Sequence, residues 1–177
     1  MVLLLLQYTV QAQRSRFADV LDVHYTMKDT VNIAASFFSD MGAWHAYALP
    51  ERGTSQGFTG PLLMDMKGEW LSAAIAQLHL VENGRELVLE QNEQHTRYYP
   101  GLLQLGYTGD SVEVQLQLLF SSNRESVIQT VVRNKATHAR QLTLQWEGVA
   151  ALKRAAFTAG DNNIRIAVTG TTHIFQL

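Results

Sequence analysis

Hydrophobic and polar residues alternate along much of the chain in the manner of half-buried β-strands. The clearest case runs from Val112 to Leu118, where Glu113, Gln115 and Gln117 lie between valines and leucines. Successive side chains of a strand point to opposite faces, so this pattern predicts one buried and one solvated face. Further strands or extended segments are predicted at 31–38, 61–64, 70–81, 87–89, 102–107, 127–132, 142–146, 164–168 and 174–177.

Turn-forming residues separate these strands at about 8–12 residues, the spacing typical of all-β domains. Asn83-Gly84 favours a type I′ turn and predicts a hairpin that returns through 87–89. A second hairpin is predicted between 127–132 and 142–146. The alanine-rich piece 71–76 has an alternative, a turn of helix, because of its intrinsic propensity. Helical periodicity is otherwise scarce, so we predict an all-β chain, an antiparallel β-sandwich.

The N-terminal residues 1–13 are interpreted as the end of a truncated signal peptide. Residues 2–6 are apolar, and Val10-Gln11-Ala12 has the spacing that a signal peptidase accepts. This interpretation predicts a periplasmic or secreted protein. The alternative is a hydrophobic strand, and in either case the apolar run is too short to span a bilayer, so no membrane partner is expected.

The rest of the chain divides into two predicted parts. Residues 14–34 show no sustained period and are expected to form an irregular lead-in, followed by the sandwich domain at 35–177. The last predicted strand stops at Leu177 within an apolar pattern. Unpaired apolar strand edges promote aggregation, so we expect the domain to be incomplete at this end.

Composition narrows the classes of partner. Of the 177 residues, 46% are hydrophobic and 17% charged, and the formal net charge is −2. This balance is that of a globular protein with no basic field for nucleic acid. The chain has no cysteine, which excludes disulfides and thiolate metal sites. None of the six histidines has a partner at metal-ligand spacing, so no metal or other cofactor is expected.

The stretch 40–60 departs from the alternating pattern and is the predicted binding loop. Aromatic rings stack on the C–H faces of sugars, charged groups bind hydroxyls, and glycines let the backbone approach closely. The alternative is that Trp44 and Phe58 anchor the core at a domain edge and the glycines only turn the chain. The candidate residues are Asp40, Trp44, His45, Tyr47, Arg52 and Phe58.

No complete active site is predicted. The chain has no Gly-x-Ser-x-Gly element, and residues 53–60 lack the lysine of a phosphate-binding loop. Glycoside hydrolysis needs two carboxyl groups across the scissile bond. Nothing in the sequence identifies such a pair among the carboxylates near the loop, which are Asp40, Glu51, Asp65 and Glu69.

Tyr98-Tyr99 is a second candidate surface. Neighbouring residues of an extended segment point to opposite faces, so at most one of the two rings meets a ligand. The alternative is a strand entry fixed by Pro100.

Three motifs together resemble a known family. They are Phe-Phe-Ser-Asp-Met-Gly-Ala-Trp-His at 37–45 with Leu49-Pro50, Gly-Phe-Thr-Gly-Pro at 57–61, and Leu-Gln-Trp-Glu-Gly at 144–148. A long meander separates the second motif from the third. In this order the three motifs resemble the N-terminal domain of the bacterial glucosidases of glycoside hydrolase family 63. The resemblance covers about 35–148, most of the chain.

The resemblance implies a super-β-sandwich placed ahead of a helical (α/α)6 barrel, in an exported protein that hydrolyses α-glucosidic bonds with inversion. In that family the acid and base carboxylates lie on the barrel. A chain of 177 residues has no room for that barrel, so no catalytic residue is assigned and whether this chain is an enzyme stays open. The resemblance implies that Trp44 and His45 face the barrel or the mouth of its pocket.

Three hypotheses follow. In the first, the chain is the non-catalytic N-terminal domain of an exported α-glucosidase, with the downstream barrel as partner and an oligosaccharide or α-glucoside as substrate of the parent enzyme. In the second, it is a stand-alone carbohydrate-binding module with Trp44, Tyr47 and Phe58 as a stacking platform. In the third, it is a structural surface domain without a ligand.

Overall fold

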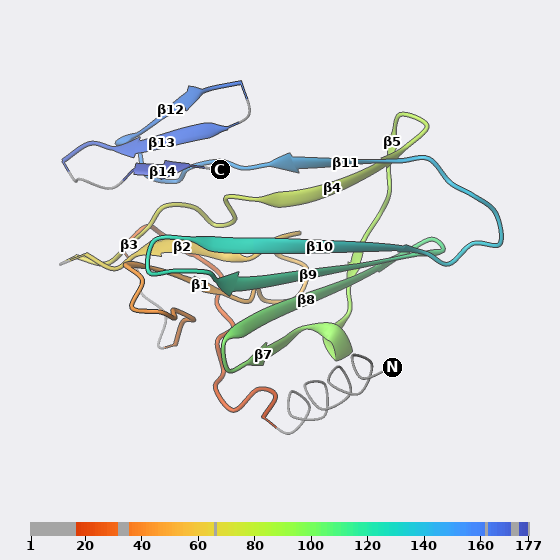
Figure 1. Ribbon diagram of the computed structural model, residues 1–177, viewed down its shortest axis with the longest axis horizontal. Coiled ribbons are helices and arrows are strands. Elements are labelled where there is room, and N and C mark those ends of the chain that lie inside the picture. Colours follow the sequence, from red (N-terminus) through yellow and green to blue (C-terminus); the bar gives the residue numbers. More distant parts are fainter. Residues whose placement is uncertain (1–16, 32–35, 66, 162, 171–173, 177) are drawn as a thin grey trace, which may run out of the picture.

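The computed structural model describes residues 17–31, 36–65, 67–161, 163–170 and 174–176 (Figure 1). These residues form fourteen strands and one short 3-10 helix, with no α-helix among them. The elements are β1 (His45–Ala48), β2 (Thr59–Leu63), β3 (Glu69–Trp70), β4 (Gln77–Glu82), β5 (Arg85–Glu86), β6 (Glu90–Gln91), η1 (Glu93–His95), β7 (Arg97–Tyr99), β8 (Leu102–Gly109), β9 (Val112–Phe120), β10 (Ser126–Asn134), β11 (Leu142–Glu147), β12 (Ala155–Ala159), β13 (Ile164–Val168) and β14 (Ile174–Gln176).

Two antiparallel sheets form the main sandwich. One has the order β10-β9-β8-β6, with β7 also paired to β8, and the other has the order β11-β4-β5. Figure 1 shows β8, β9 and β10 as long neighbouring strands, β4 and β11 alongside them, and β12–β14 as a small separate sheet. Leu78 and Leu80 of β4 share the largest core cluster with Leu116 and Leu118 of β9. The predicted all-β antiparallel sandwich is confirmed.

The alternation of β9 is confirmed residue by residue. Its valines, leucines and Phe120 at every second position are buried, and the residues between them are half-buried. β9 lies between β8 and β10, so its backbone is hydrogen-bonded on both edges. This strand therefore supplies the central row of the core.

The predicted Asn83-Gly84 turn is also confirmed, although its return strand is shorter and earlier than expected. Both residues have positive φ, 50° and 74°, as a type I′ turn requires. The return strand is Arg85–Glu86, and 87–89 is not a strand. Leu87 N still donates to the Leu80 carbonyl at 2.8 Å, so pairing ends one residue into the predicted segment.

The predicted hairpin between 127–132 and 142–146 is wrong. β11 leaves the sheet of β10 and pairs with β4, with Leu144 opposite Leu80. An alternating strand fits either sheet of a sandwich equally well, because both sheets need one apolar face. The partner is decided by the loop before β11, which can cross from one sheet to the other.

Arg140 anchors that crossing. Its Nε and Nη2 donate to the two carboxylate oxygens of Glu82 at 2.9 and 2.8 Å, and its Nη1 donates to the Asp110 carbonyl at 2.7 Å. These hydrogen bonds lower the pKa of Glu82. One guanidinium thus ties β4 of one sheet to the β8–β9 turn of the other, in the bidentate geometry that suits arginine.

Two further sheets extend the core. The sheet β1-β2-β3 buries Trp70, whose ring stacks on Tyr25 of the lead-in with 5.1 Å between ring centroids. The sheet β12-β13-β14 buries Ile166 against Leu63 and Leu71. The described part of the lead-in, 17–31, therefore packs on the sandwich although it forms no regular strand.

The segment 71–76, between β3 and β4, is irregular and is hydrogen-bonded on both sides. Leu71 N donates to the Pro61 carbonyl at 2.8 Å, and the Leu71 carbonyl accepts from Ala151 N at 2.7 Å. Backbone groups that bond to neighbouring segments cannot make the bonds between residues i and i−4 of a helix. The helical alternative for 71–76 is therefore wrong.

Two glycines make room for this segment. A Cβ on Gly57 would lie 2.2 Å from the Ala76 carbonyl oxygen, and one on Gly148 would lie 1.8 Å from the Ile75 carbonyl oxygen. These distances are far below van der Waals contact, so at both positions only glycine lets the neighbouring backbones approach this closely. The segment is held between the two glycine backbones.

Several predictions fall outside the described residues. They concern the signal segment 1–13, the part of the lead-in before residue 17, residues 32–35 of the segment 31–38, and Leu177. Within the described part of that segment, Phe38 forms a single antiparallel bridge with Tyr47.

The close approach of Gly148 to the Ile75 backbone predicts a large effect of Gly148→Ala on stability. We expect the substitution to lower the free energy of unfolding by about 3 kcal/mol, because the new Cβ must displace the Ile75 backbone. Urea unfolding of the full chain measures this change. Gly84→Ala is the control, since its Cβ meets open space and only the positive φ costs about 1 kcal/mol. Equal losses of unfolding free energy in the two variants would contradict this role of Gly148.

Candidate functional site

The predicted binding loop begins with a tight turn at Asp40–Ala43. Met41 and Gly42 both have positive φ, 56° and 71°, and Ala43 N donates to the Asp40 carbonyl at 3.0 Å. The Asp40 carboxylate accepts from Met41 N at 2.7 Å, so it stabilises its own turn. The turn holds Met41 at its tip and delivers the chain to β1.

Trp44, directly before β1, is the exposed aromatic residue of the loop. Its side chain is 65% exposed, and that of Met41 is 59% exposed. Met64 N donates to the Trp44 carbonyl at 2.9 Å, which continues the β1–β2 ladder and puts the two residues opposite each other on one face. We call the surface made by Phe37, Met41, Trp44 and Met64 the Trp44 face.

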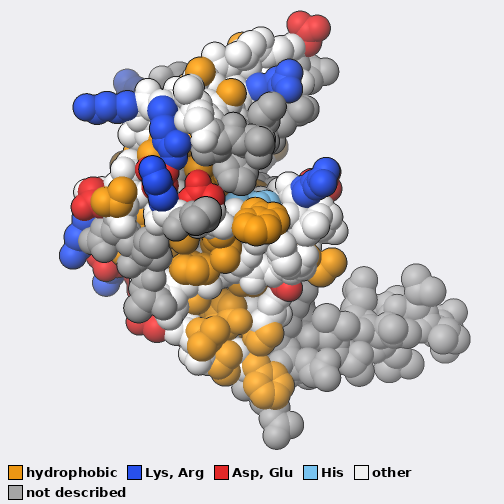
Figure 2. Space-filling view, turned by 90° about the vertical axis from the view of Figure 1, so that its left-hand side faces the viewer, with side chains coloured by type: hydrophobic (Ala, Val, Ile, Leu, Met, Phe, Trp, Pro, Cys, Tyr) orange, Lys and Arg blue, Asp and Glu red, His pale blue; other side chains and the backbone are white. Residues whose placement is uncertain are grey.

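The residues that follow Trp44 alternate between two cores. Ala46 and Ala48 belong to the cluster around Trp70, on the side of the Trp44 face. His45 and Tyr47 point the other way, and the His45 ring lies 5.0 Å from that of Phe120. Phe120 ends β9, so the Trp44 face lies at the same end of the molecule as the β9–β10 turn. Figure 2 looks onto this end, where hydrophobic side chains gather.

His45 and Tyr47 are buried packing residues in this arrangement. Their rings meet edge to face with centroids 5.8 Å apart, and the Tyr47 hydroxyl forms a hydrogen bond with Ser126 Oγ at 2.9 Å. Burial lowers the pKa of the His45 imidazole and raises the pKa of the Tyr47 hydroxyl. Neither ring is presented at the surface, so the implied position of His45 toward a barrel is not seen in its side chain.

Phe58 is also a core residue, in the same cluster as Tyr47. The predicted stacking platform of Trp44, Tyr47 and Phe58 therefore does not form, because two of its three rings fill the sandwich. The alternative that Trp44 and Phe58 anchor the core is correct for Phe58 and wrong for Trp44, and Tyr47 is a further core residue.

Arg52 lies in a different part of the loop and points to other partners. Its side chain is exposed, with Nε 3.9 Å from a carboxylate oxygen of Glu93 in η1. The Ser55 carbonyl accepts from the Tyr107 hydroxyl at 3.3 Å, which fixes this part of the loop against β8. The candidate residues thus separate into one exposed aromatic residue, a buried cluster and a distant arginine.

Three of the four carboxylates near the loop have structural partners, Asp40 in its own turn as described above. Asp65 accepts from the backbone N–H groups of Lys67 and Gly68 at 2.9 and 3.1 Å, and Glu69 pairs with Arg154. No two of the four named carboxylates in the described part of the chain are shown facing each other across a cleft, as glycoside hydrolysis would require. No group of three or more potential metal ligands is found among the described residues either.

Of the second candidate surface, Tyr98 packs on the core with its ring 6.0 Å from that of Phe38. Tyr98 pairs with Leu103 and Tyr99 with Leu102 in the β7–β8 ladder, so the two tyrosines lie on opposite faces. This arrangement matches the expectation that at most one of the two rings is free for a ligand.

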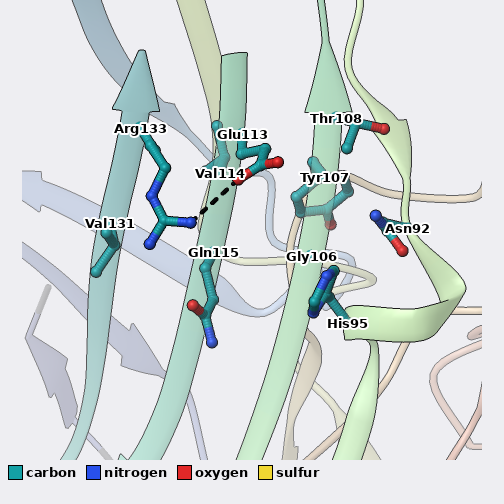
Figure 3. A pocket seen from close by; sticks show the side chains of 10 residues that line it. All are labelled: Asn92, His95, Gly106, Tyr107, Thr108, Glu113, Val114, Gln115, Val131 and Arg133. Carbon is teal, nitrogen blue, oxygen red and sulfur yellow. Dashed lines mark hydrogen bonds and ion pairs between the residues drawn. The ribbon is translucent and has the colours of Figure 1, made fainter. Parts of the chain in front are cut away.

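A shallow depression lies on the outer face of the larger sheet (Figure 3). Gly106 of β8 leaves the position beside η1 without a side chain, and Glu113 and Arg133 form an ion pair at 3.3 Å on the neighbouring strands. The cavity volume is about 80 Å³, whereas pockets that enclose small ligands measure several hundred Å³ (roughly 300–1,000). It has room for only a few water molecules, so we assign it no ligand.

Met41, Met64 and Phe37 were not among the predicted site residues. Met41 could have been found from its turn, since Asp-Met-Gly places the second residue at an exposed tip. Met64 and Phe37 could not, because only the strand register brings them to the side of Trp44.

The comparison with known families matches this chain to the one described as glucosidase YgjK, N-terminal, over residues 21–169. This chain belongs to that family. The match includes the whole loop 40–60 and both sheets of the main sandwich. It confirms the resemblance to the N-terminal domain of a family 63 glucosidase.

Membership of the family gives the chain a coarse function, that of an N-terminal domain in a glycoside hydrolase. No helix of the described residues has the length and apolar character needed to cross a bilayer. The Trp44 face is an exposed apolar surface of this domain.

Buried His45 predicts a pH-dependent stability. Its pKa in the folded chain lies below the ordinary value of 6.5, so the unfolded chain binds more protons at mildly acidic pH. Stability is complete above that value and falls as the pH drops through it. We expect the free energy of unfolding to fall as the pH drops from about 7.5 to about 5.

Urea unfolding at several pH values measures this loss, and His45→Phe should reduce it while keeping a ring in the cluster. His95→Gln, at an exposed histidine of η1, is the control and should keep the wild-type slope. A His45→Phe chain with the wild-type pH dependence would show that His45 is not the titrating group.

Proposed function

We propose that this chain is the non-catalytic N-terminal domain of an exported α-glucosidase, and that it docks on the catalytic (α/α)6 barrel through the Trp44 face. The family match supports the type of enzyme. The observation that carries the docking is Trp44 itself, a large aromatic side chain held 65% exposed, three residues after exposed Met41.

The composition of the Trp44 face favours a protein partner. Aromatic residues and methionine are enriched at protein interfaces, and the thioether chain adapts to the shape of its partner. Phe37 and Met64 are half-buried, so they form a base on which Trp44 projects. An exposed Trp on such a base is a typical energetic anchor of an interface.

A sugar-binding role for the same surface is less well supported. A saccharide site needs hydrogen-bonding groups around the stacking ring. Asp40, the nearest candidate, already accepts a hydrogen bond from its own turn, and Arg52 lies beside η1 instead. Because Tyr47 and Phe58 lie in the core, the hypothesis of a stand-alone binding module leaves Trp44 as the one ring of the predicted platform that could stack on a sugar.

In this proposal hydrolysis belongs to the barrel, and the domain shapes the pocket mouth from outside. An oligosaccharide or α-glucoside is then the substrate of the parent enzyme. The N-terminal residues direct the protein to the periplasm or the medium. The stability of the sandwich serves to hold Trp44 in place.

Trp44→Ala in the full-length enzyme tests the docking. Removal of an anchoring Trp costs about 2 kcal/mol or more of interface free energy, so we expect weaker domain docking and slower hydrolysis of p-nitrophenyl α-glucoside. In the 177-residue chain alone the same change should alter stability by less than about 0.5 kcal/mol, because the side chain is exposed.

Val88→Ala is the matched control, since Val88 is 79% exposed and lies beside Gly109 near the β8–β9 turn. It should leave both activity and docking unchanged. Wild-type activity and thermal unfolding of the full-length Trp44→Ala enzyme would overturn the docking proposal. A native product no larger than this chain, detected with an antibody against it, would overturn the parent-enzyme proposal.

A further inference from the structure

Most sheet edges in the described part of the chain are covered or very short. Phe38 and Tyr47 exchange two backbone hydrogen bonds, at 2.7 and 2.9 Å, along the outer edge of β1. Asp19 covers β7, because its N–H donates to the Tyr98 carbonyl and its carboxylate accepts from Tyr98 N, both at 2.8 Å. β5 and β6 have two residues each. Covered or short edges are the usual protection against pairing with another chain.

Three longer edge strands, β10, β11 and β12, have no such protection, because among the described residues each pairs with a single strand. β11 is the edge of the smaller sheet of the main sandwich, six residues long and paired with β4. Its sequence, Leu-Thr-Leu-Gln-Trp-Glu, contains no proline and no lysine, and its register with β4 runs without a bulge. Its second edge therefore presents a regular row of backbone donors and acceptors, which is the template that an added strand requires.

The inner face of β11 is also incompletely covered. Leu144 and Trp146 are 37% and 43% exposed, whereas their partners across the ladder, Leu80 and Leu78, are fully buried. All four residues lie on the same face of the sheet, the face that packs on the core. The inner-face side chains are thus buried on β4 and become partly exposed on β11, the edge strand. A strand added beyond β11 would cover these two side chains.

We propose that the free edge of β11 pairs antiparallel with the β11 of a second copy of this chain. A twofold axis through Leu144 sets Leu144 opposite itself and Leu142 opposite Trp146, so apolar residues meet on the inner face. Thr143 then faces Gln145 on the outer face. The result is one continuous sheet of six strands, β5-β4-β11 from each copy.

The sequence of β11 favours a second copy over an unrelated strand. A twofold axis between two residues would pair inner-face with outer-face side chains, whereas one through Leu144 keeps apolar residues together. Its single charged residue, Glu147, falls opposite neutral Gln141, so no like charges meet. The strand is therefore self-complementary in pattern and in charge, which a twofold interface requires. This inference does not depend on the proposed function.

The first test changes charge on the outer face, where residues 143 and 145 are exposed in the single chain. Thr143→Lys with Gln145→Lys places lysine opposite lysine twice across the axis, which should raise the dimer dissociation constant at least tenfold. Thr143→Lys with Gln145→Glu places lysine opposite glutamate at the same positions and should keep the dimer. Sedimentation equilibrium over a concentration series measures all three proteins.

A second test reads the register directly. Because the chain has no cysteine, Leu144→Cys introduces one thiol per copy. Directly opposite residues of antiparallel strands have Cα atoms about 4.5–5.5 Å apart, within the range of a disulfide. Mild oxidation should link two copies of this variant. Val127→Cys on exposed β10 is the control and should not give the same yield.

The proposal is overturned by a wild-type chain that stays monomeric over the concentration series or that forms open-ended polymers. It is also overturned if the two charge variants dimerise equally well, or if Leu144→Cys links no faster than Val127→Cys. Dimers of the wild-type and lysine–glutamate chains, monomers of the double-lysine chain and rapid linkage at position 144 support it.

Discussion

The segment 70–78, which runs from the end of β3 through the irregular residues 71–76 into β4, is the constraint on which the rest of the structure depends. Its residues enter all three core clusters: Trp70 packs beneath β1 and β2, Leu71 packs on the β12–β14 sheet, and Leu78 packs in the main sandwich. The segment can do this because its middle part, 71–76, belongs to no strand or helix. Its backbone groups bond to the neighbouring segments on both sides, and Gly57 and Gly148 let those segments approach to backbone contact. The separate sheets are joined through this one stretch.

The Trp44 face is a consequence of the same packing. β1 contributes side chains to two cores at once, so every residue of this strand is buried. The alternation that sends His45 and Tyr47 toward β9 sends Ala46 toward Trp70, and it leaves the preceding residue on that second side. Because the core there ends with the small side chains of Ala46 and Ala48, Trp44 has no pocket to fill and projects outward. Its exposure follows from the layout of the core.

The two proposed surfaces differ in what they offer a partner. The Trp44 face offers side chains, an aromatic ring and methionines on a base of packed residues, which suits a shaped protein surface. The β11 edge offers mainly backbone, a row of donors and acceptors with Leu144 and Trp146 half-covered beside it. Pairing of the first kind depends on the partner's shape, and pairing of the second kind depends on register. A domain with both can contact a barrel and another chain through different chemistry.

Local pattern alone determined much of this protein. The alternation of β9, the Asn83-Gly84 turn and the all-β class are properties of neighbouring residues, and the motif around Trp44 pointed to the family. Other features were decided by contacts between residues far apart in the chain. The partner of β11 is one, because Arg140 bonds to Glu82 and to the β8–β9 turn. The division of the loop into exposed Trp44 and buried Tyr47 and Phe58 is another. The alternation of hydrophobic and polar residues predicts that a strand has two different faces. Only the packed structure decides which core, if any, each face contacts.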